Sequence, residues 1–305
     1  MVDALALRMA GALHALALME NDDALVACYP PNSLATTEQL RSILLRVVRE
    51  HRNYIQSFLT SPPQTNEVGR SGVLFGGFLQ IAKETGLPLR LLEIGASAGL
   101  NTIWDRYHYQ LGIADWGERQ SAVRIAPDWH GPLPPLQAPL LVTERRACDA
   151  APIDLEDPAQ RLRLRAYIWA DQRERLLRLE GAITTARAVG QKVDRADAAN
   201  WVRAQLKEPV KATATVLFHS IMWQYLPAQS QADIKAILQK VGGDATETSP
   251  LAWLRFEPLH AAVLGLEPLH AESRCELRLT LWPNARESCL AVAHPHGTHV
   301  VWSGL

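Results

Sequence analysis

The sequence predicts an α/β protein whose mostly parallel sheet follows a helical region and ends in an antiparallel hairpin. Residues 1–83 carry helical patterns and no convincing strand. From residue 89 to residue 256, short apolar runs alternate with helical segments, which is typical of parallel strands joined by crossover helices. Apolar runs at 276–282 and 288–293, separated by Pro283-Asn284-Ala285-Arg286, predict the hairpin.

Composition limits the possible partners. A chain of 305 residues, 48% of them hydrophobic, predicts a helical region over residues 1–85 and an α/β domain over residues 86–305. Its 31 basic and 32 acidic residues nearly cancel, so bulk charge indicates neither nucleic acid nor an anionic membrane. The four cysteines form no C-x-x-C pair and read as reduced thiols. With no basic leader and no apolar run long enough to cross a bilayer, we expect a cytoplasmic protein.

The helical region is divided by two proline-containing breaks, at residues 29–33 and 61–66. Just after the first break, Thr36 and Gln39 have the spacing of a capping box, which predicts the start of a helix. After the second break, a short helix leads into the first strand at Leu89.

One stretch organises the predicted sheet. Residues 89–94 form a short apolar strand, and a loop containing Gly95, Ser97 and Gly99 follows it. A helical pattern then begins at Leu100. Small residues let the backbone approach a ligand closely, and the free N–H groups of a new helix face that ligand. The stretch therefore predicts a nucleotide-type ligand.

Other interpretations of this loop stay open. Gly95-x-Ser97-x-Gly99 also fits the nucleophile elbow of α/β-hydrolases, and an ordinary βα turn of small residues is a further possibility. The dinucleotide-binding pattern fits worse, because its third glycine would fall at Leu100. The hydrolase is disfavoured because no strand is predicted before Leu89, whereas several precede the elbow in that fold.

Further strands and helices alternate along the chain. The additional predicted strands cover residues 123–125, 140–143, 213–219 and 251–256. On this assignment Asp128 follows the second strand and Asp149 the third. Pro158 opens a long helix with Trp169 on its inward face, and Ser230 caps a later helix.

With these elements in place, the chain resembles the class I S-adenosylmethionine-dependent methyltransferases, with Ser97 at the position of the middle glycine of their first motif. It resembles in particular a bacterial family of unknown function. Members of that family carry Gln-Thr-Asn-Glu, a Glu-x-Gly-Ala-Ser-Ala-Gly-Leu-Asn loop and Asp-Arg-Tyr, found here at residues 64–67, 93–101 and 105–107. The resemblance implies a Rossmann-like class I methyltransferase sheet with an N-terminal helical cap, and no particular substrate.

The resemblance also implies roles for individual residues. It implies S-adenosylmethionine as the cofactor and a small molecule as the substrate. In that fold a carboxylate after the second strand binds the ribose hydroxyls, and Asp128 holds that position here. A second acidic residue, after the third strand, accepts a hydrogen bond from the adenine amino group, and Asp149 holds that position. The residues expected at the cofactor are Glu93, Gly95, Ala96, Ser97, Gly99, Asn101, Asp128, Asp149 and Ser220.

Catalytic and substrate-binding residues are expected after the strand at 213–219. His219 is the candidate general base, with Tyr225 nearby, because histidine titrates near neutral pH. A packed histidine that is hydrogen-bonded to the backbone is the alternative. Arg70, Trp223 and His296 are the expected substrate contacts.

Three function hypotheses follow. The first is a methyltransferase, the second a non-catalytic protein of the same fold that binds an adenosine cofactor, and the third a serine hydrolase using Ser97. His294, His296 and His299 alternate near the end of the chain, but no neighbouring carboxylate or cysteine completes a metal site, so none is expected. The sequence predicts neither the methyl acceptor nor the oligomeric state.

Overall fold

The computed structural model describes residues 4–32, 36–61, 63–259 and 274–304. The described residues form two compact units, neither of which is continuous in sequence. The first comprises residues 1–66 and 153–180, and the second comprises residues 67–152 and 181–305. Residues 67–85, assigned above to the helical region, therefore belong to the unit that contains the sheet.

The first unit is helical. Its helices are α1 (Leu5–Leu18), α2 (Asp23–Val26), α3 (Thr37–Glu50), α4 (Arg52–Leu59), α6 (Pro158–Ala166) and the first half of α7 (Arg173–Ala188). Its core includes Leu16, Leu25 and Val47. The predicted capping box is confirmed: Gln39 N donates to Thr36 Oγ1 (3.3 Å), and Thr36 N donates to Gln39 Oε1 (2.9 Å).

The prediction of one long helix starting at Pro158 is wrong, because the structure has two separate helices there. The chain leaves the helix at Tyr167, whose ring packs on Phe58 with centroids 5.6 Å apart in the core of this unit. A second helix, α7, begins only at Arg173. Trp169 lies in the connection and is 55% exposed, because the aromatic residue that anchors this segment is Tyr167.

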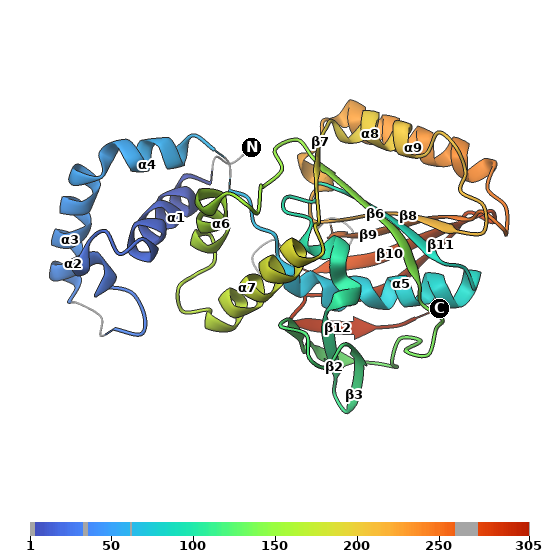
Figure 1. The fold of residues 1–305 in the computed structure, drawn as a ribbon, viewed down its shortest axis with the longest axis horizontal. Helices are drawn as coiled ribbons and strands as arrows, with labels where there is room; N and C mark the ends of the chain where they lie inside the picture. The colour runs from blue at the N-terminus through green and yellow to red at the C-terminus, as the bar shows by residue number, and fades with distance from the viewer. Residues whose placement is uncertain (1–3, 33–35, 62, 260–273, 305) are drawn as a thin grey trace. The chain divides into compact units, whose positions relative to one another are not determined.

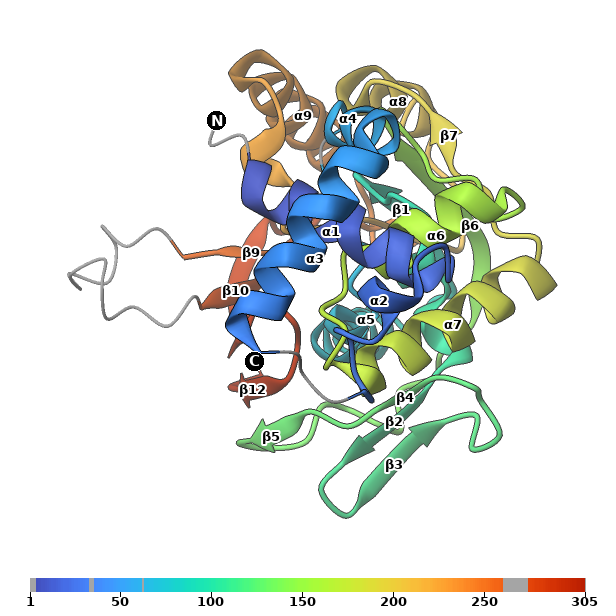
Figure 2. The ribbon, with the colours of Figure 1, turned by 90° about the vertical axis from the view of Figure 1, so that its left-hand side faces the viewer.

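The second unit holds two sheets (Figures 1 and 2). The nine-stranded sheet has the order β5-β12-β11-β10-β9-β8-β1-β6-β7, and a small sheet has the order β3-β2-β4. The strands are β1 (Leu89–Ile94), β2 (His108–Leu111), β3 (Ala114–Gly117), β4 (Arg124–Ile125), β5 (Asp128–His130), β6 (Val142–Asp149), β7 (Asp194–Arg195), β8 (Ala214–Ser220), β9 (Leu251–Pro258), β10 (Cys275–Trp282), β11 (Arg286–Ala293) and β12 (His299–Trp302). The helical elements are η1 (Val68–Arg70), α5 (Ser71–Thr85), η2 (Leu100–Arg106), α8 (Ala198–Gln205), η3 (Trp223–Tyr225) and α9 (Ala228–Gly243).

Five parallel strands form one part of the large sheet. Numbered by their order in the chain, β1, β6, β7, β8 and β9 lie side by side as 3-2-1-4-5. Helix α5 covers one face of the sheet, and α8 and α9 cover the other (Figure 1). The central strands β1 and β8 are buried along their whole length, as expected of parallel strands covered on both faces. The predicted mostly parallel α/β sheet is confirmed.

The rest of the large sheet is antiparallel. The predicted hairpin is confirmed as β10 and β11, and it belongs to a meander in which β9, β10, β11 and β12 pair successively antiparallel. The sequence analysis predicted the hairpin alone, and the antiparallel part of the sheet is longer than that. Strand β5 then pairs parallel with β12 and forms the outer edge.

Close packing positions the helices against the sheet. In α5, a Cβ added at Gly77 would lie 2.6 Å from Leu254 Cδ1, so glycine lets the helix approach β9. Helix α9 begins at Ala228 after Pro227, so the prediction that Ser230 caps it is wrong. Among the described residues, no helix combines the length and the apolar character needed to cross a bilayer.

Candidate functional site

The candidate site lies where the strand order of the parallel sheet reverses, between β1 and β8. Open α/β sheets bind ligands outside the carboxyl ends of their strands at such a reversal. Two segments meet there: the loop 95–99 after β1 and the segment 221–225 after β8.

The loop 95–99 has an unusual backbone. Gly95 (φ 65°), Ser97 (φ 56°) and Gly99 (φ 71°) all adopt left-handed conformations. Glycine does so without strain, whereas a serine in this region is uncommon. Gly95 is required for a second reason, because a Cβ there would lie 2.6–2.9 Å from side-chain atoms of Met222. The loop is thus held tightly against the segment that follows β8.

Asp149, at the end of β6, holds the loop from the other side. Its Oδ2 accepts a hydrogen bond from Ser97 N (2.9 Å), and its Oδ1 accepts one from Ala151 N (2.8 Å). Ala96 N donates to the carbonyl oxygen of Cys148 (3.1 Å). Because β6 is the second parallel strand in chain order, Asp149 stands where the sequence analysis expected Asp128.

Asp128 does not lie near this loop. It is in β5, at the outer edge of the nine-stranded sheet, with β12, β11, β10, β9 and β8 between it and β1. The assignment was wrong because residues 123–130 do not supply a parallel strand next to β1. Strand β4 joins the small sheet instead, and β5 pairs with β12.

Glu93 is buried beneath the loop. Its Oε2 accepts a hydrogen bond from the Thr102 hydroxyl. Burial is the main cause that raises the pKa of this carboxyl, and the negative charge of Asp149 acts in the same direction. Thr102 and Arg70 oppose them, and the resulting pKa is about 8. Near neutral pH the carboxyl is therefore protonated, and it can donate a hydrogen bond.

Arg70, from the turn before α5, crosses the end of β8. Its Nε donates to the carbonyl oxygen of Pro295 (3.1 Å), and its Nη1 donates to that of Ser220 (3.0 Å). Burial lowers the pKa of the guanidinium, and Glu67 is the largest influence that raises it. Within the described ranges Nη2 has no hydrogen-bond partner, which leaves one face of a cation available for an anionic group.

Asn101 connects the loop to the segment that carries Arg70. Its Oδ1 accepts from the Ser71 hydroxyl (2.7 Å), and its Nδ2 donates to the carbonyl oxygen of Glu67 (3.3 Å). Neither side-chain bond of Asn101 lies within its own helix, whose N-cap is Gly99. Nδ1 of His296 lies 3.2 Å from Glu67 Oε2, so His296 belongs to the same group.

His219 is buried, and both its ring nitrogens are occupied. Trp253 Nε1 lies 3.1 Å from Nε2 and can only donate, so Nε2 is the acceptor and Nδ1 carries the proton. Nδ1 lies 2.6 Å from Glu257 Oε1, and the ring stacks on Trp223 with centroids 5.1 Å apart. This geometry favours the packed histidine over a general base. Its hydrogen-bond partners, however, are the side chains of Glu257 and Trp253 and not the backbone that was expected.

Glu257, which sequence reasoning missed, is the central carboxylate at this end of the sheet. Its Oε1 also accepts from Met222 N (3.2 Å) and Trp223 N (3.3 Å), and so orders the segment after β8. Its Oε2 is buried and has no hydrogen-bond partner among the described residues. The position of Glu257, one residue before the end of β9, could have identified it as a site residue. Residues at the carboxyl ends of strands face the ligand in such sheets.

The structure gathers most of the predicted site residues around the ends of β1 and β8. Tyr225 lies at the surface, 63% exposed, and is close enough to Arg70 to affect the pKa of its guanidinium. The residues brought to this end of the sheet are Arg70, Glu93, Gly95, Ala96, Ser97, Gly99, Asn101, Asp149, His219, Ser220, Trp223, Tyr225 and His296. Asp128 is the exception.

Two observations count against Ser97 as a nucleophile. Its Oγ is buried and makes no hydrogen bond to any residue that the structure describes, so no base activates it. In addition, helices occupy the described chain before β1, and no described strand precedes it. A hydrolase elbow would need both an activating base and earlier strands.

The fold and the site define an open α/β protein whose polar groups converge at the reversal of strand order. A family model described as "Uncharacterized protein conserved in bacteria (DUF2332)" matches residues 2–302, and the chain belongs to that family. This confirms the resemblance to a bacterial family of unknown function. No curated protein and no solved structure matches the chain.

Proposed function

We propose that the protein is a class I, Rossmann-like methyltransferase that uses S-adenosylmethionine and acts on a small molecule. The observation that carries the proposal is the loop 95–99. It lies at the reversal of strand order with three left-handed residues, and Asp149 holds it at the end of the neighbouring strand. The meander after β9 extends the terminal hairpin that the methyltransferase resemblance implies.

The donors and acceptors around the loop fit an amino-acid–nucleoside ligand. A carboxylate offers about four lone-pair positions. Asp149 uses two of them for Ser97 N and Ala151 N, which leaves capacity for two ribose hydroxyls. Nη2 of Arg70 would bind the carboxylate of the methionine part. The protonated Glu93 beneath the loop would donate to it or to a bound water.

Methyl transfer asks little of the protein beyond alignment and, for a protonated acceptor, a base. S-adenosylmethionine supplies an electrophilic methyl group on its sulfonium. Since both nitrogens of His219 are occupied, we assign the acceptor's proton to Glu257, whose Oε2 is buried at this end of the sheet and has no hydrogen-bond partner among the described residues. His219 then acts as a positioning residue that orients Glu257 through Oε1.

A non-catalytic protein that binds an adenosine cofactor is the second candidate. It is favoured by the occupied His219 ring and by Met222, whose side chain lies directly on Gly95. Supplying methyl-labelled S-adenosylmethionine with small-molecule acceptors separates the two candidates. An enzyme transfers label, and the Glu257→Gln variant transfers less of it while still binding the cofactor.

Calorimetric titration with S-adenosylmethionine and S-adenosylhomocysteine tests the proposal. We expect the wild-type protein to bind both ligands and Gly95→Arg to bind neither, because the added side chain meets Met222 and fills the ligand position. Gly112→Arg is the matched control. Gly112 also has a positive φ (62°), but it lies in the turn between β2 and β3 with nothing within 4 Å of an added Cβ. A folded, ligand-free wild type that binds neither compound would refute the proposal, as would unchanged binding by Gly95→Arg.

A further inference from the structure

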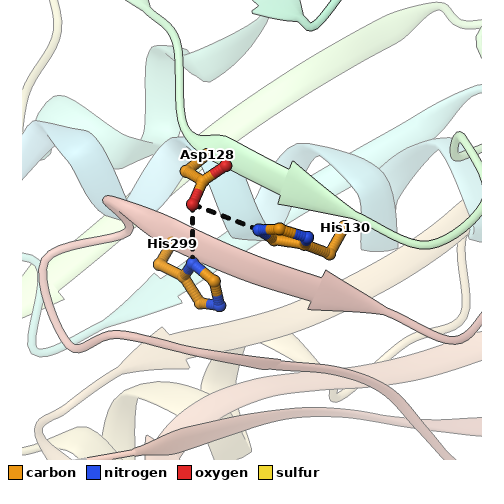
Figure 3. Close-up of side chains that lie close together, drawn as sticks. All are labelled: Asp128, His130 and His299. Carbon is orange, nitrogen blue, oxygen red and sulfur yellow. Dashed lines mark hydrogen bonds and ion pairs between the residues drawn. The ribbon is translucent and has the colours of Figure 1, made fainter.

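Asp128, His130 and His299 form a cluster at the outer edge of the large sheet (Figure 3). Oδ2 of Asp128 lies 3.0 Å from Nδ1 of His299 and 3.1 Å from Nε2 of His130. One potential ligand atom from each residue lies within 4.8 Å of the other two. The same carboxylate oxygen thus faces two imidazole nitrogens that come from different strands.

Strand geometry builds this cluster. Strands β5 and β12 pair in parallel with Asp128 directly opposite His299. Asp128 and His130 alternate along β5 and so share its solvent face. Trp129, between them, points the other way and stacks on Trp302 with centroids 5.5 Å apart. The three polar side chains are therefore presented by two paired strands whose opposite face is anchored by aromatic packing.

We infer that Asp128, His130 and His299 bind a divalent transition-metal ion, with Zn²⁺ as the ion that best suits the three donors. Two imidazole nitrogens and one carboxylate oxygen are common zinc ligands, at bond lengths of about 2.0–2.2 Å. In a tetrahedral site such bonds place neighbouring donors about 3.3 Å apart. The separations from Asp128 Oδ2 to the two imidazole nitrogens, 3.0 and 3.1 Å, are close to this value. All three donor atoms lie within 4.8 Å of one another, so side-chain rotations would bring them around one ion.

The cluster leaves room for further ligands. The side chains of Asp128, His130 and His299 are 68%, 53% and 49% exposed, so water completes the coordination sphere. Three protein ligands with an open position are typical of an accessible zinc site, whereas a closed structural site has four. Bound metal would link β5 to β12 and so stabilise the edge of the sheet.

A second cluster of possible metal ligands is less suited to bind a cation than Asp128, His130 and His299. Asp22, Glu50 and His51 also gather possible ligand atoms in the helical unit. There the Arg46 guanidinium already bonds both carboxylates, with Nη1 2.7 Å from Asp22 Oδ2. Its positive charge takes the place that a metal ion would occupy. Among the described residues the Asp128 carboxylate bonds only to the two histidines, and no Lys or Arg neutralises it.

Sequence reasoning weighed His294, His296 and His299 as a metal set, but in the structure the side chains of His296 and His299 face different partners. His296 contacts Glu67 at the candidate functional site, whereas His299 faces Asp128, which is 171 residues earlier in the chain. The missing carboxylate was therefore distant in sequence. The inference does not depend on the proposed methyltransferase function, because β5 and the loop 95–99 lie at different places in the sheet.

Calorimetric titration of the metal-free full-length protein with ZnCl₂ tests the inference. We expect one Zn²⁺ per chain with a micromolar dissociation constant, and affinity at least about tenfold weaker in Asp128→Asn and in His299→Gln. His51→Gln is the matched control, because it removes a partly buried histidine of the second cluster and leaves the triad intact. It should bind Zn²⁺ as the wild type does.

Thermal melting and circular dichroism distinguish zinc binding at the triad from non-specific binding and from misfolding of the variants. Bound metal stabilises the folded state, so Zn²⁺ should raise the melting temperature of the wild type and of His51→Gln equally, and that of His299→Gln by less. All three triad side chains are exposed, so these substitutions leave the core intact, and circular dichroism of the variants checks this. A wild type that shows no saturable zinc binding, or triad variants that bind zinc as tightly as the wild type, would overturn the inference.

Discussion

Replacing Glu93 with glutamine should make the stability of the protein less sensitive to alkaline pH. Glu93 is buried at the end of β1, and burial raises the pKa of its carboxyl from an ordinary 4.5 to about 8. Glutamine has nearly the same shape, stays neutral, and keeps an oxygen that can accept the Thr102 hydrogen bond. The substitution therefore removes the ionisation and preserves the packing.

The sign and size of the effect follow from proton linkage. Between pH 4.5 and 8 the folded state keeps the Glu93 proton, while the unfolded chain releases it. The folded state binds more protons in this range, so stability falls as the pH rises through it. With one pKa unit worth about 1.4 kcal/mol, the wild type should lose about 4 kcal/mol of unfolding free energy between about pH 5 and pH 9 on account of Glu93.

Urea denaturation followed by tryptophan fluorescence measures this difference. Of the nine tryptophans, only Trp169 lies in the helical unit, so the signal reports the unit that contains Glu93. Subtracting the Glu93→Gln curve from the wild-type curve cancels groups that titrate in both proteins. Glu247→Gln is the control, since Glu247 is exposed in the connection between α9 and β9. Identical pH dependence in wild type and Glu93→Gln would refute the reasoning.

Two further predictions concern packing and capping. Gly77→Ala should destabilise the protein by about 1–3 kcal/mol because the new methyl group meets Leu254, whereas Gly243→Ala in α9 meets nothing and should add up to about 1 kcal/mol. Equal effects in a paired urea titration would contradict this. Thr36→Ala should cost about 1 kcal/mol by removing the acceptor for Gln39 N. Unchanged thermal stability of the helical unit would show that the cap contributes nothing.

The sequence by itself determined the features that depend on neighbouring residues. The capping box at Thr36, the apolar strand β1 and the hairpin of β10 and β11 were predictable, because each depends on side chains a few residues apart. The small residues of the loop 95–99 likewise predicted a tight turn, and the structure shows three left-handed backbones there.

Local pattern could not show which strands become neighbours. Residues 123–130 and 140–149 both resemble strands, yet of the two only 140–149 pairs with β1, as β6. Asp149, and not Asp128, therefore lies beside the loop 95–99. Short strands in edge positions have little periodicity of their own, and their partners decide where they lie. The assignment failed for that reason.

Only the tertiary structure decided the chemical state of the key side chains. His219 is occupied because Trp253 and Glu257, more than thirty residues later, bring a donor and an acceptor to its ring. Asp128 meets His299 for the same kind of reason, through the pairing of two strands far apart in the chain. Hydrogen-bond partners and burial set whether a group is free, charged or neutral, and both arise from contacts that form only when the chain folds.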